Sequence, residues 1–360
     1  MTFERENVRR LAGYVPGEQP ARAVAKLNTN ENPFPPSDAV LAALKEVDGE
    51  MLRRYPDPTA WAFRTEAARL HGLTPDHIIA TNGGDELLRL ALTTFLPPGS
   101  PLGLADPSYS LYPVLAAIHG SPKSAVSLNA DWWVPADTAR RWNKAGAKVA
   151  MLVNPHAPSG RLASPGELAE VARVFKGVLV VDEAYVDFVD PVIAHDTIRL
   201  VREFDNVLLL RSMSKGYSLA GLRLGYGIGS PGLVAPMLSK TKDSYNVDAV
   251  AQKVGEAALR HQHTAAASWA FVREERLRLT AELTRRGFLC APSQANFLLA
   301  TVPGPSGTAE RLLWRLAGEG IFVRWFDQDR LRNNLRISIG TKNENNALLA
   351  ALDRLIRQEP

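Results

Sequence analysis

Two short segments of this sequence bring together side chains that could do chemistry as a set. Residues 212–215 read Ser-Met-Ser-Lys, so Lys215 follows the hydroxyls of Ser212 and Ser214, and Arg223 comes shortly afterwards. Residues 182–185 read Asp-Glu-Ala-Tyr, which places the carboxylate of Asp182 shortly before the phenol of Tyr185. A lysine amine becomes a nucleophile when it is desolvated or lies close to other cations. Hydroxyls and a planar guanidinium suit phosphate.

A third segment predicts an anion site. Residues 82–86 read Asn-Gly-Gly-Asp-Glu and precede a helical pattern, so backbone N–H groups at Gly84 and Asp85 can approach an anion at a helix N-terminus. An amine, a carboxylate and a phosphate cradle are what pyridoxal 5′-phosphate needs: a Schiff-base partner, a partner for the pyridinium nitrogen and an anchor. Each motif alone is common, and their conjunction predicts a site for this cofactor.

Each polar segment follows an apolar run that predicts a β-strand. The runs are 77–80, 147–153, 178–181 and 207–210, and the last three are nearly continuous in small and branched apolar residues, as in parallel strands buried on both faces. Amphipathic stretches separate them, and one begins with Ser164, a proline and then Glu167, which is a capping-box pattern. This alternation predicts an open α/β sheet. The carboxyl ends of its parallel strands would bring the polar segments to one crevice.

The two ends of the chain differ in pattern from its middle. Residues 1–30 contain prolines and show little periodicity, and long helical patterns begin near residue 250. Strand-like runs follow at 297–300, 321–325 and 335–339, before a closing helix that places three leucines on one face. We therefore expect an N-terminal arm (1–30) that joins a small α+β domain (251–360), and a large cofactor-binding domain (31–250).

Composition and charge exclude several classes of protein. The 360 residues carry 42 Lys+Arg and 38 Asp+Glu without long runs of one sign, which argues against a nucleic-acid partner. Cys290 is the only cysteine, which excludes an intramolecular disulfide and fits a reducing compartment. No apolar stretch reaches the roughly 18 residues of a membrane span, and residues 1–10 lack the apolar core of a signal peptide. We expect a cytoplasmic enzyme with no membrane partner.

Three other patterns point to functions that the sequence does not support. Residues 212–215 also fit the Ser-x-x-Lys of β-lactamases and penicillin-binding proteins, but the accompanying Ser-Asp-Asn and Lys-Thr-Gly tripeptides are absent. Residues 227–232 fit Gly-x-Gly-x-x-Gly, but no second strand ending in an acid follows, and Ser230 with the next proline predicts a helix start. His261 and His263 have no third ligand nearby, so we expect no metal site.

Taken together, these residues resemble the fold-type I pyridoxal-phosphate aminotransferases. The resemblance rests on residues 182–185, 211–215 and 220–225, and it covers nearly the whole chain. The segments 27–33 (Leu-Asn-Thr-Asn-Glu-Asn-Pro), 54–56, 107–109, 245–247 and 335–341 (Leu-Arg-Ile-Ser-Ile-Gly-Thr) resemble the histidinol-phosphate aminotransferase branch. It implies a large, mostly parallel-sheet domain and a smaller α+β domain.

The resemblance also assigns roles around the cofactor. Lys215 would form the Schiff base and carry the proton, Asp182 would pair with the pyridinium nitrogen, and Tyr185 would hydrogen-bond the phenolate oxygen O3′. Tyr109 would stack on the ring, and Asn154 belongs to the same set. The phosphate would be bound by Gly84, Asp85, Ser212, Ser214 and Arg223, and by Tyr55 of a neighbouring subunit, which implies a homodimer with shared active sites.

On the substrate side, the resemblance implies that Arg336 binds an acidic group. Tyr14, Asn30, Tyr245, Asn246 and Arg324 match other substrate-side positions. Arg324 has an alternative interpretation, because it precedes Trp325 and Phe326 and could pack its stem on aromatic rings. Two arginines would suit a dianionic phosphate.

The implied reaction transfers the amino group of histidinol phosphate to 2-oxoglutarate, giving imidazole acetol phosphate and glutamate in histidine biosynthesis. An aromatic amino acid aminotransferase and a threonine-phosphate decarboxylase stay open as alternatives. A non-catalytic amino acid sensor on the same fold is a fourth possibility, although Lys215 and Asp182 argue against it.

One position departs from the family pattern. The family commonly has Asn-Pro-x-Asn-Pro-Thr-Gly, in which the second asparagine donates to O3′, whereas residues 154–160 here place Ala157 at that position. An alanine side chain cannot donate a hydrogen bond, so His156, Asn154, a water or no group at all would take that role.

Overall fold

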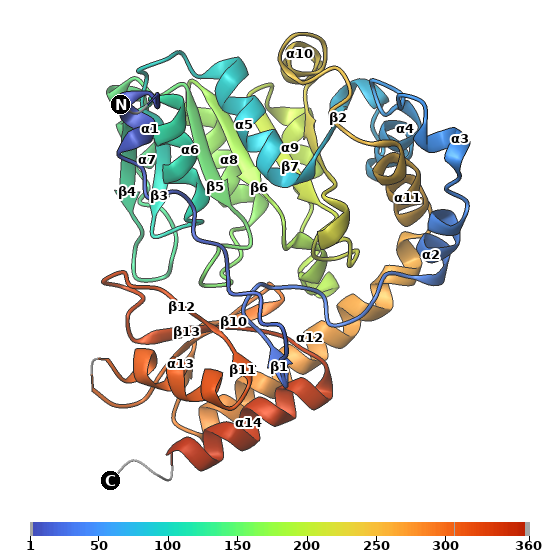
Figure 1. Cartoon of the computed structure of the whole chain (residues 1–360). Helices are drawn as coiled ribbons and strands as arrows, with labels where there is room; N and C mark the ends of the chain where they lie inside the picture. Colours follow the sequence, from blue (N-terminus) through green and yellow to red (C-terminus); the bar gives the residue numbers. More distant parts are fainter. Residues whose placement is uncertain (1–2, 306, 357–360) are drawn as a thin grey trace.

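A seven-stranded sheet forms the centre of the computed structural model, which describes residues 3–305 and 307–356. The strand order is β2-β8-β7-β6-β5-β3-β4. All neighbours are parallel except β8, which is antiparallel to both β2 and β7. β2 therefore runs in the same direction as β7, and the carboxyl ends of all strands but β8 lie at one edge (Figure 1). The strands are β2 (Ile78–Thr81), β3 (Leu102–Asp106), β4 (Lys123–Ser127), β5 (Val149–Val153), β6 (Val178–Asp182), β7 (Val207–Ser212) and β8 (Gly225–Gly229).

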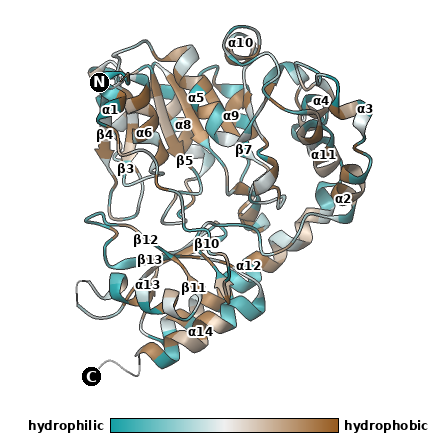
Figure 2. Cartoon of the chain, in the orientation of Figure 1, coloured by the Kyte–Doolittle hydropathy of each residue, from teal (hydrophilic) through white to brown (hydrophobic). Residues whose placement is uncertain are grey.

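Both faces of this sheet are buried against helices. Along β6, Leu179 and Val181 belong to one hydrophobic cluster, whereas Val178 and Val180 belong to another. Alternate residues of a strand point to opposite faces, so a continuous apolar run is what a doubly covered strand requires. In Figure 2 the central strands are accordingly brown, whereas the outer helices carry teal segments. Helices α5 (Gly83–Phe95) and α6 (Leu111–His119) cover one face, and α4 (Trp61–His71), α8 (Pro165–Val174) and α11 (Ala249–Arg260) contribute to the other.

A second sheet is formed by the C-terminal part of the chain. It is antiparallel, in the order β12-β13-β10-β9, and comprises β9 (Leu289–Cys290), β10 (Phe297–Thr301), β12 (Arg324–Trp325) and β13 (Asn334–Ser338). The N-terminal strand β1 (Ala25–Lys26) pairs in parallel with β11 (Ile321–Phe322), so the blue β1 lies beside the orange-red β11 in Figure 1. A third hydrophobic cluster includes Leu27 together with residues of these C-terminal elements.

A long helix links the two sheets. α12 (Gln262–Arg285) has 24 residues; Trp269 packs against the cluster of the large sheet, and Leu279 and Leu283 belong to the C-terminal cluster. The other helices are α1 (Glu6–Arg9), α2 (Asp38–Lys45), α3 (Gly49–Leu52), α7 (Thr138–Ala145), α9 (Ile198–Glu203), α10 (Pro231–Pro236), α13 (Thr308–Gly318) and α14 (Lys342–Ile356). No helix among the described residues is long and apolar enough to cross a membrane.

The structure confirms the expected α/β class and most of the expected elements. The four runs expected as strands of the large sheet correspond to β2, β5, β6 and β7, and the expected helix after Ser230 is α10. The capping box is also confirmed, since Glu167 N–H donates to Ser164 Oγ and Ser164 N–H donates to the Glu167 carboxylate. The run 321–325, which we expected as one strand, is divided between β11 and β12, which belong to different sheets.

The sequence did not predict β3, β4 or β8. β8 reads Gly-Tyr-Gly-Ile-Gly, and a Cβ at Gly227 would come within 2.8 Å of Leu87 on α5 and 2.9 Å of Ile79 on β2. Glycine is therefore needed for close packing there, although it is an unfavourable residue in an isolated strand. β4 is an edge strand with mostly exposed residues, so its hydrophobic signal is weak.

Candidate active site

A cavity of about 270 Å³ lies at the carboxyl edge of the large sheet. Its walls come from the ends of β5, β6 and β7, the start of α5, the N-terminal arm and the C-terminal sheet. The structure thus brings together the polar segments that follow separate strands, as the sequence predicts. The expected site residues that line the cavity are Tyr14, Asn30, Gly84, Asp85, Tyr109, Asp182, Tyr185, Ser212, Ser214, Lys215, Arg223, Arg324 and Arg336.

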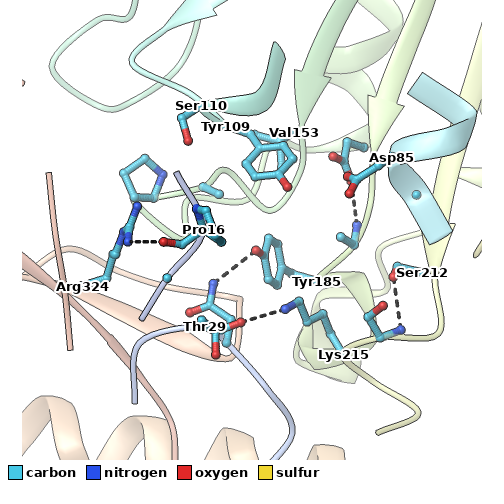
Figure 3. A pocket seen from close by; sticks show the side chains of 18 of the residues that line it. Pro16, Thr29, Asp85, Tyr109, Ser110, Val153, Tyr185, Ser212, Lys215 and Arg324 are labelled. Carbon is cyan, nitrogen blue, oxygen red and sulfur yellow. Dashed lines mark hydrogen bonds between the residues drawn. The ribbon is translucent and has the colours of Figure 1, made fainter. Parts of the chain in front are cut away.

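Lys215 follows β7, and its amine points into the cavity (Figure 3). Its Nζ donates to the backbone oxygen of Thr29, at 2.8 Å, on the N-terminal arm. Burial, with a smaller contribution from the nearby Arg336 guanidinium, lowers the pKa of Lys215 to about 8. A larger fraction of the amine is therefore unprotonated near neutral pH than for an exposed lysine, which favours nucleophilic chemistry.

The backbone around Lys215 is fixed by residues far away in the sequence. The side-chain amide of Asn32 donates to the backbone oxygen of Lys215 at 3.1 Å. The indole Nε1 of Trp269, on α12, donates to the backbone oxygen of Gly216 at 2.6 Å. The arm and α12 therefore hold the turn that presents the amine.

Asp182 is the last residue of β6 and is buried. Its Oδ2 accepts from the hydroxyl of Tyr112 at 2.9 Å, and its Oδ1 accepts from the backbone N–H of Ala184 at 3.1 Å. Burial raises the pKa of Asp182 to about 6. A buried carboxylate with neutral partners gains most from a cation placed opposite it, because charge is costly to bury unpaired. The protonated ring nitrogen of pyridoxal phosphate is such a cation.

The part of the cavity beside the start of α5 is built to bind an anion. Arg223 Nη1 donates to Ser214 Oγ at 3.3 Å, and Arg223 Nη2 lies 3.8 Å from the carboxylate of Asp85. α5 begins here at Gly83, whose φ is +73° and whose added Cβ would lie 2.6 Å from Arg223 Nη2. Glycine therefore allows the guanidinium to approach the helix N-terminus, where backbone N–H groups and the helix dipole attract a phosphate.

Aromatic rings and one amide complete the wall of the cavity. Tyr109 packs edge-to-face against Tyr112, with ring centroids 5.4 Å apart, and against Tyr14, at 6.0 Å. The hydroxyl of Tyr185 accepts from Asn30 Nδ2 at 3.1 Å, which leaves its own proton free to be donated to a ligand. Asn30 is held in turn by Ser338, whose hydroxyl donates to its Oδ1 at 3.0 Å.

Two arginines of the C-terminal sheet, Arg324 and Arg336, line the cavity, and Figure 3 shows Arg324 on the side away from Asp85. Arg336 donates to the backbone oxygen of Asn28 at 2.9 Å, and its buried Nε has no partner among the described residues. Arg324 donates to the backbone oxygens of Val15, at 3.1 Å, and Pro16, at 3.3 Å. Both guanidiniums also lie 5.5 Å from the ring of Phe326. Arg324 therefore packs on an aromatic ring and still reaches the cavity.

Four of the expected site residues do not line this cavity in the described part of the chain. Tyr55 is exposed and stacks on Tyr245, with ring centroids 4.4 Å apart. Asn246 donates to the backbone oxygen of Ala80 and to Glu86, both at 3.0 Å. Asn154 donates to the backbone oxygen of Ala163 and accepts from its N–H, so its amide is used within its own loop.

Ala157 is buried and lines the cavity, but neither of its polar neighbours replaces the missing donor. His156 Nδ1 lies 2.8 Å from Ser159 Oγ, and Nε2 lies 3.0 Å from the backbone oxygen of Pro107. Burial lowers the pKa of His156 to about 4, so the ring is neutral near pH 7. Asn154 is also engaged elsewhere, so neither side chain takes the place of the asparagine that the family pattern has at position 157.

Sequence reasoning missed several residues of the site. Tyr112, the partner of Asp182, lies at the start of α6, three residues after Tyr109, and this closeness in the sequence was the signal that could have indicated it. The backbone oxygen of Thr29 gives no signal in a sequence, because its role depends on where the arm lies. Within the described chain, no cluster of three or more His, Cys, Asp or Glu side chains could hold a metal ion.

The residues present fit pyridoxal phosphate: an amine, a buried carboxylate, a donor phenol and an anion cradle surround one cavity. Comparisons with known proteins agree. The chain is 42% identical to histidinol-phosphate aminotransferase 1 of Trichormus variabilis over 99% of both chains. It is 41% identical to the histidinol-phosphate aminotransferase of Citrifermentans bemidjiense over 98% of both.

The fold is also shared with solved structures. Histidinol-phosphate aminotransferase from Sinorhizobium meliloti in complex with pyridoxal-5′-phosphate superposes with a TM-score of 0.90 at 25% identity, covering 99% of this chain and 98% of that chain. Thermus thermophilus aspartate aminotransferase has the same fold, with a TM-score of 0.79 at 21% identity over 99% of this chain and 100% of that chain. The model of the family described as "Aminotransferase class I and II" matches residues 22–352 of this chain. The chain therefore belongs to the aminotransferase class I and II family.

Proposed function

We propose that this chain is a pyridoxal-phosphate-dependent aminotransferase that moves the amino group of histidinol phosphate to 2-oxoglutarate. The observation that carries the proposal is one cavity that is lined by Lys215 and Asp182 and also by Arg324 and Arg336. The activity named for relatives that are about 40% identical over nearly the whole chain supports the choice of donor. The products would be imidazole acetol phosphate and glutamate, as in histidine biosynthesis.

Pyridoxal phosphate supplies an aldehyde that condenses with amines and a protonated ring that accepts the electron pair released at the substrate Cα. Lys215 would carry the proton during amino transfer, a task for which its lowered pKa suits it. Asp182, held by Tyr112, would keep the ring nitrogen protonated, and Tyr185, which accepts from Asn30, would donate to O3′. Tyr109 would pack on the ring. The phosphate would be bound by Gly84, Asp85, Ser212, Ser214 and Arg223, all of which line the cavity.

The arginine pair accounts for the preference for a phosphorylated donor. One guanidinium is sufficient for a carboxylate, whereas two can share a dianion through several N–H donors. Arg324 and Arg336 now donate to backbone oxygens of the arm, so an incoming phosphate would replace neutral acceptors by charged ones. Charged acceptors form stronger hydrogen bonds with guanidinium. 2-Oxoglutarate and glutamate, which carry two carboxylates, would use the same pair.

We further propose a homodimer in which Tyr55 of one subunit reaches the cofactor phosphate of the other, while Tyr245 and Asn246 serve the substrate side. The support is a set of exposed apolar residues on and beside α2, α3 and α4, since apolar residues gathered on a surface commonly mark interfaces. Its exposed members are Leu41, Leu44, Leu52, Tyr55, Trp61 and Tyr245. Tyr55→Phe should weaken pyridoxal phosphate binding while the mass in solution stays that of a dimer. A monomeric wild-type protein would contradict this proposal.

Two further expectations remain proposals. We divide the chain into an arm (1–30), a large domain (31–250) and a small domain (251–360), which is supported by the cluster that Leu27 forms with C-terminal residues. We place the protein in the cytoplasm, a reducing compartment in which its single thiol, Cys290, would remain free.

The test of the reaction is a comparison of donors with the purified, cofactor-loaded protein. Histidinol phosphate, phenylalanine and threonine phosphate are each supplied with 2-oxoglutarate, and glutamate and carbon dioxide are measured. Glutamate formed fastest from histidinol phosphate supports the proposal. A preference for phenylalanine would instead support an aromatic aminotransferase, and carbon dioxide released from threonine phosphate would support the decarboxylase. Binding without turnover would indicate a sensor.

A further inference from the structure

One arginine joins a loop of the C-terminal sheet, which lines the cavity, to a loop of the large sheet. Arg330 lies in loop 326–333, between β12 and β13 of the C-terminal sheet. Its Nη1 donates to the backbone oxygen of Leu128 at 2.8 Å, and its Nη2 donates to the backbone oxygens of Asn129, at 2.6 Å, and Ala130, at 3.0 Å. These acceptors belong to loop 128–133, which follows the edge strand β4 of the large sheet.

The same guanidinium makes an aromatic contact in that loop. It lies 3.9 Å from the centroid of the Trp132 ring, within the range of a cation–π interaction. Trp132 has a φ of +66°, a conformation that residues other than glycine rarely adopt unless their surroundings require it. Its ring also stacks on His156, with centroids 6.0 Å apart. The contact of Arg330 therefore continues, through Trp132, to the loop that carries Ala157.

Loop 326–333 forms part of the cavity wall. Phe326, Gln328 and Leu331 line the cavity, and Phe326 packs against both Arg324 and Arg336. Within the loop, the backbone oxygen of Gln328 accepts from the N–H groups of Leu331, at 2.8 Å, and Arg332, at 2.9 Å. The loop is therefore a compact turn, and Arg330 is a residue that ties it to the opposite sheet.

We propose that Arg330 is a positioning residue, which fixes loop 326–333 against loop 128–133 so that Phe326, Gln328 and Leu331 form a rigid wall for the amino donor. The role rests on the proposed amino transfer in this cavity, but not on the identity of the donor. It requires arginine in particular. A planar guanidinium can donate to three backbone oxygens and stack on an indole at once, whereas a lysine ammonium is a single compact charge.

The loop also contains a matched control. Arg332 is exposed and pairs with Asp327, at 2.7 Å, and Asp329, both within loop 326–333. Its side chain thus has the same charge and a similar place in the sequence, and its ion pairs do not cross to the other sheet. A difference between variants at 330 and 332 therefore reports the contact between the loops rather than the loss of a positive charge.

The experiment compares Arg330→Ala, Arg330→Lys and Arg332→Ala in the cofactor-loaded protein. We expect Arg330→Ala to lower kcat/KM for the preferred donor by about ten- to a hundredfold, mainly through KM, because small displacements of positioning groups are costly. The affinity for pyridoxal phosphate should stay within about twofold of wild type, since Arg330 is not among the groups expected to bind it. Arg332→Ala should leave kcat, KM and cofactor affinity within about twofold of wild type. The kcat/KM of Arg330→Lys should lie between those of Arg330→Ala and Arg332→Ala.

Hydrogen exchange provides a readout that needs no substrate. Arg330→Ala should lose backbone protection at 128–133 and at 326–333 together, whereas Arg332→Ala should lose none at 128–133. Equal kinetics and equal exchange in the two alanine variants would overturn the proposal, as would a loss of cofactor with unchanged KM. If Arg330→Ala does not fold, Arg330→Lys decides, and wild-type constants in that variant would overturn the role. If the wild-type protein shows no amino transfer, the proposed function is refuted. The contact between loops 128–133 and 326–333 is still tested by hydrogen exchange, which needs no substrate.

Discussion

The two sides of the active-site cavity are built in different ways. The side with Asp182, Lys215 and Arg223 consists of residues near strand ends of one sheet, since Asp182 ends β6, Lys215 follows β7 and Arg223 precedes β8. The side with Arg324 and Arg336 is assembled from the N-terminal arm and the C-terminal sheet, whose contacting residues are 308 or more positions apart. The strand-end side is therefore placed mainly by one sheet, with the arm and α12 holding the turn of Lys215. The arginine side depends on contacts between segments that are distant in the sequence.

The largest effect should come from removing the amine on the strand-end side. Lys215→Ala should reduce the rate of amino transfer by at least about 10³-fold, because the variant loses both the nucleophile and the group that moves the proton. Single-turnover mixing with the preferred donor would measure the rate. Borohydride treatment should also no longer attach the cofactor to the chain. The exposed Lys45 offers a control, and Lys45→Ala should behave as wild type. Normal transfer by Lys215→Ala would remove Lys215 from its role.

A smaller and more selective loss should come from the arginine side. Arg324→Ala should lower kcat/KM for histidinol phosphate by about ten- to a hundredfold, since a hydrogen bond to a charged group contributes about 1.5–3 kcal/mol. The loss for phenylalanine should be less, because its side chain carries no anion. Steady-state kinetics with both donors would measure the ratio. Equal losses would mean that Arg324 supports the arm rather than reading the donor.

We expect the charge of Arg336 on one side to influence the pKa of Lys215 on the other, and the pH dependence of a reaction rate can measure this influence. Lys215 has a lowered pKa of about 8, so its reactive, unprotonated form increases as the pH rises through that value. The rate at which pyridoxal phosphate attaches to the cofactor-free protein should therefore rise with a midpoint near pH 8. Burial is the main cause of the lowered pKa and Arg336 the next, so Arg336→Gln should move the midpoint upward. An unchanged midpoint would show that the sides are electrostatically independent.

The smallest effect concerns the position at which this chain departs from its family. Ala157→Asn would introduce an amide donor beside Tyr185, where His156 and Asn154 are engaged elsewhere. A second donor stabilises the phenolate form of the bound cofactor, so the pH midpoint of the cofactor's absorbance change should fall by about one unit, which corresponds to roughly 1.4 kcal/mol. Spectroscopic titration of both proteins would measure it. An unchanged midpoint would indicate that a water already donates there.

The contrast between the sides also explains what the sequence could predict. The strands that end at Asp182 and Ser212 contain continuous apolar runs. The sequence therefore predicted both the strands and the polar residues at their ends. β8 was not visible in the sequence. Its glycines are unfavourable in a strand, and Gly227 is needed there because Leu87 of α5 packs closely against it. The partners of the arginines are backbone oxygens of the arm, and a backbone oxygen is the same in every residue. The role of Arg330 was also invisible in the sequence, because its hydrogen-bond partners are backbone oxygens as well.

α12 has a mechanical consequence for how the sides communicate. Its 24 residues make a rod about 36 Å long, at 1.5 Å per residue, with Trp269 bonded to the backbone beside Lys215 near one end and Leu283 in the C-terminal cluster near the other. For a rod of that length, a tilt of about 5° at one end moves the other by about 3 Å. In a tilt about the first residue of α12, Trp269 would move less than Leu283, because it lies nearer to that residue, so the turn bearing the amine would be displaced less than the C-terminal cluster.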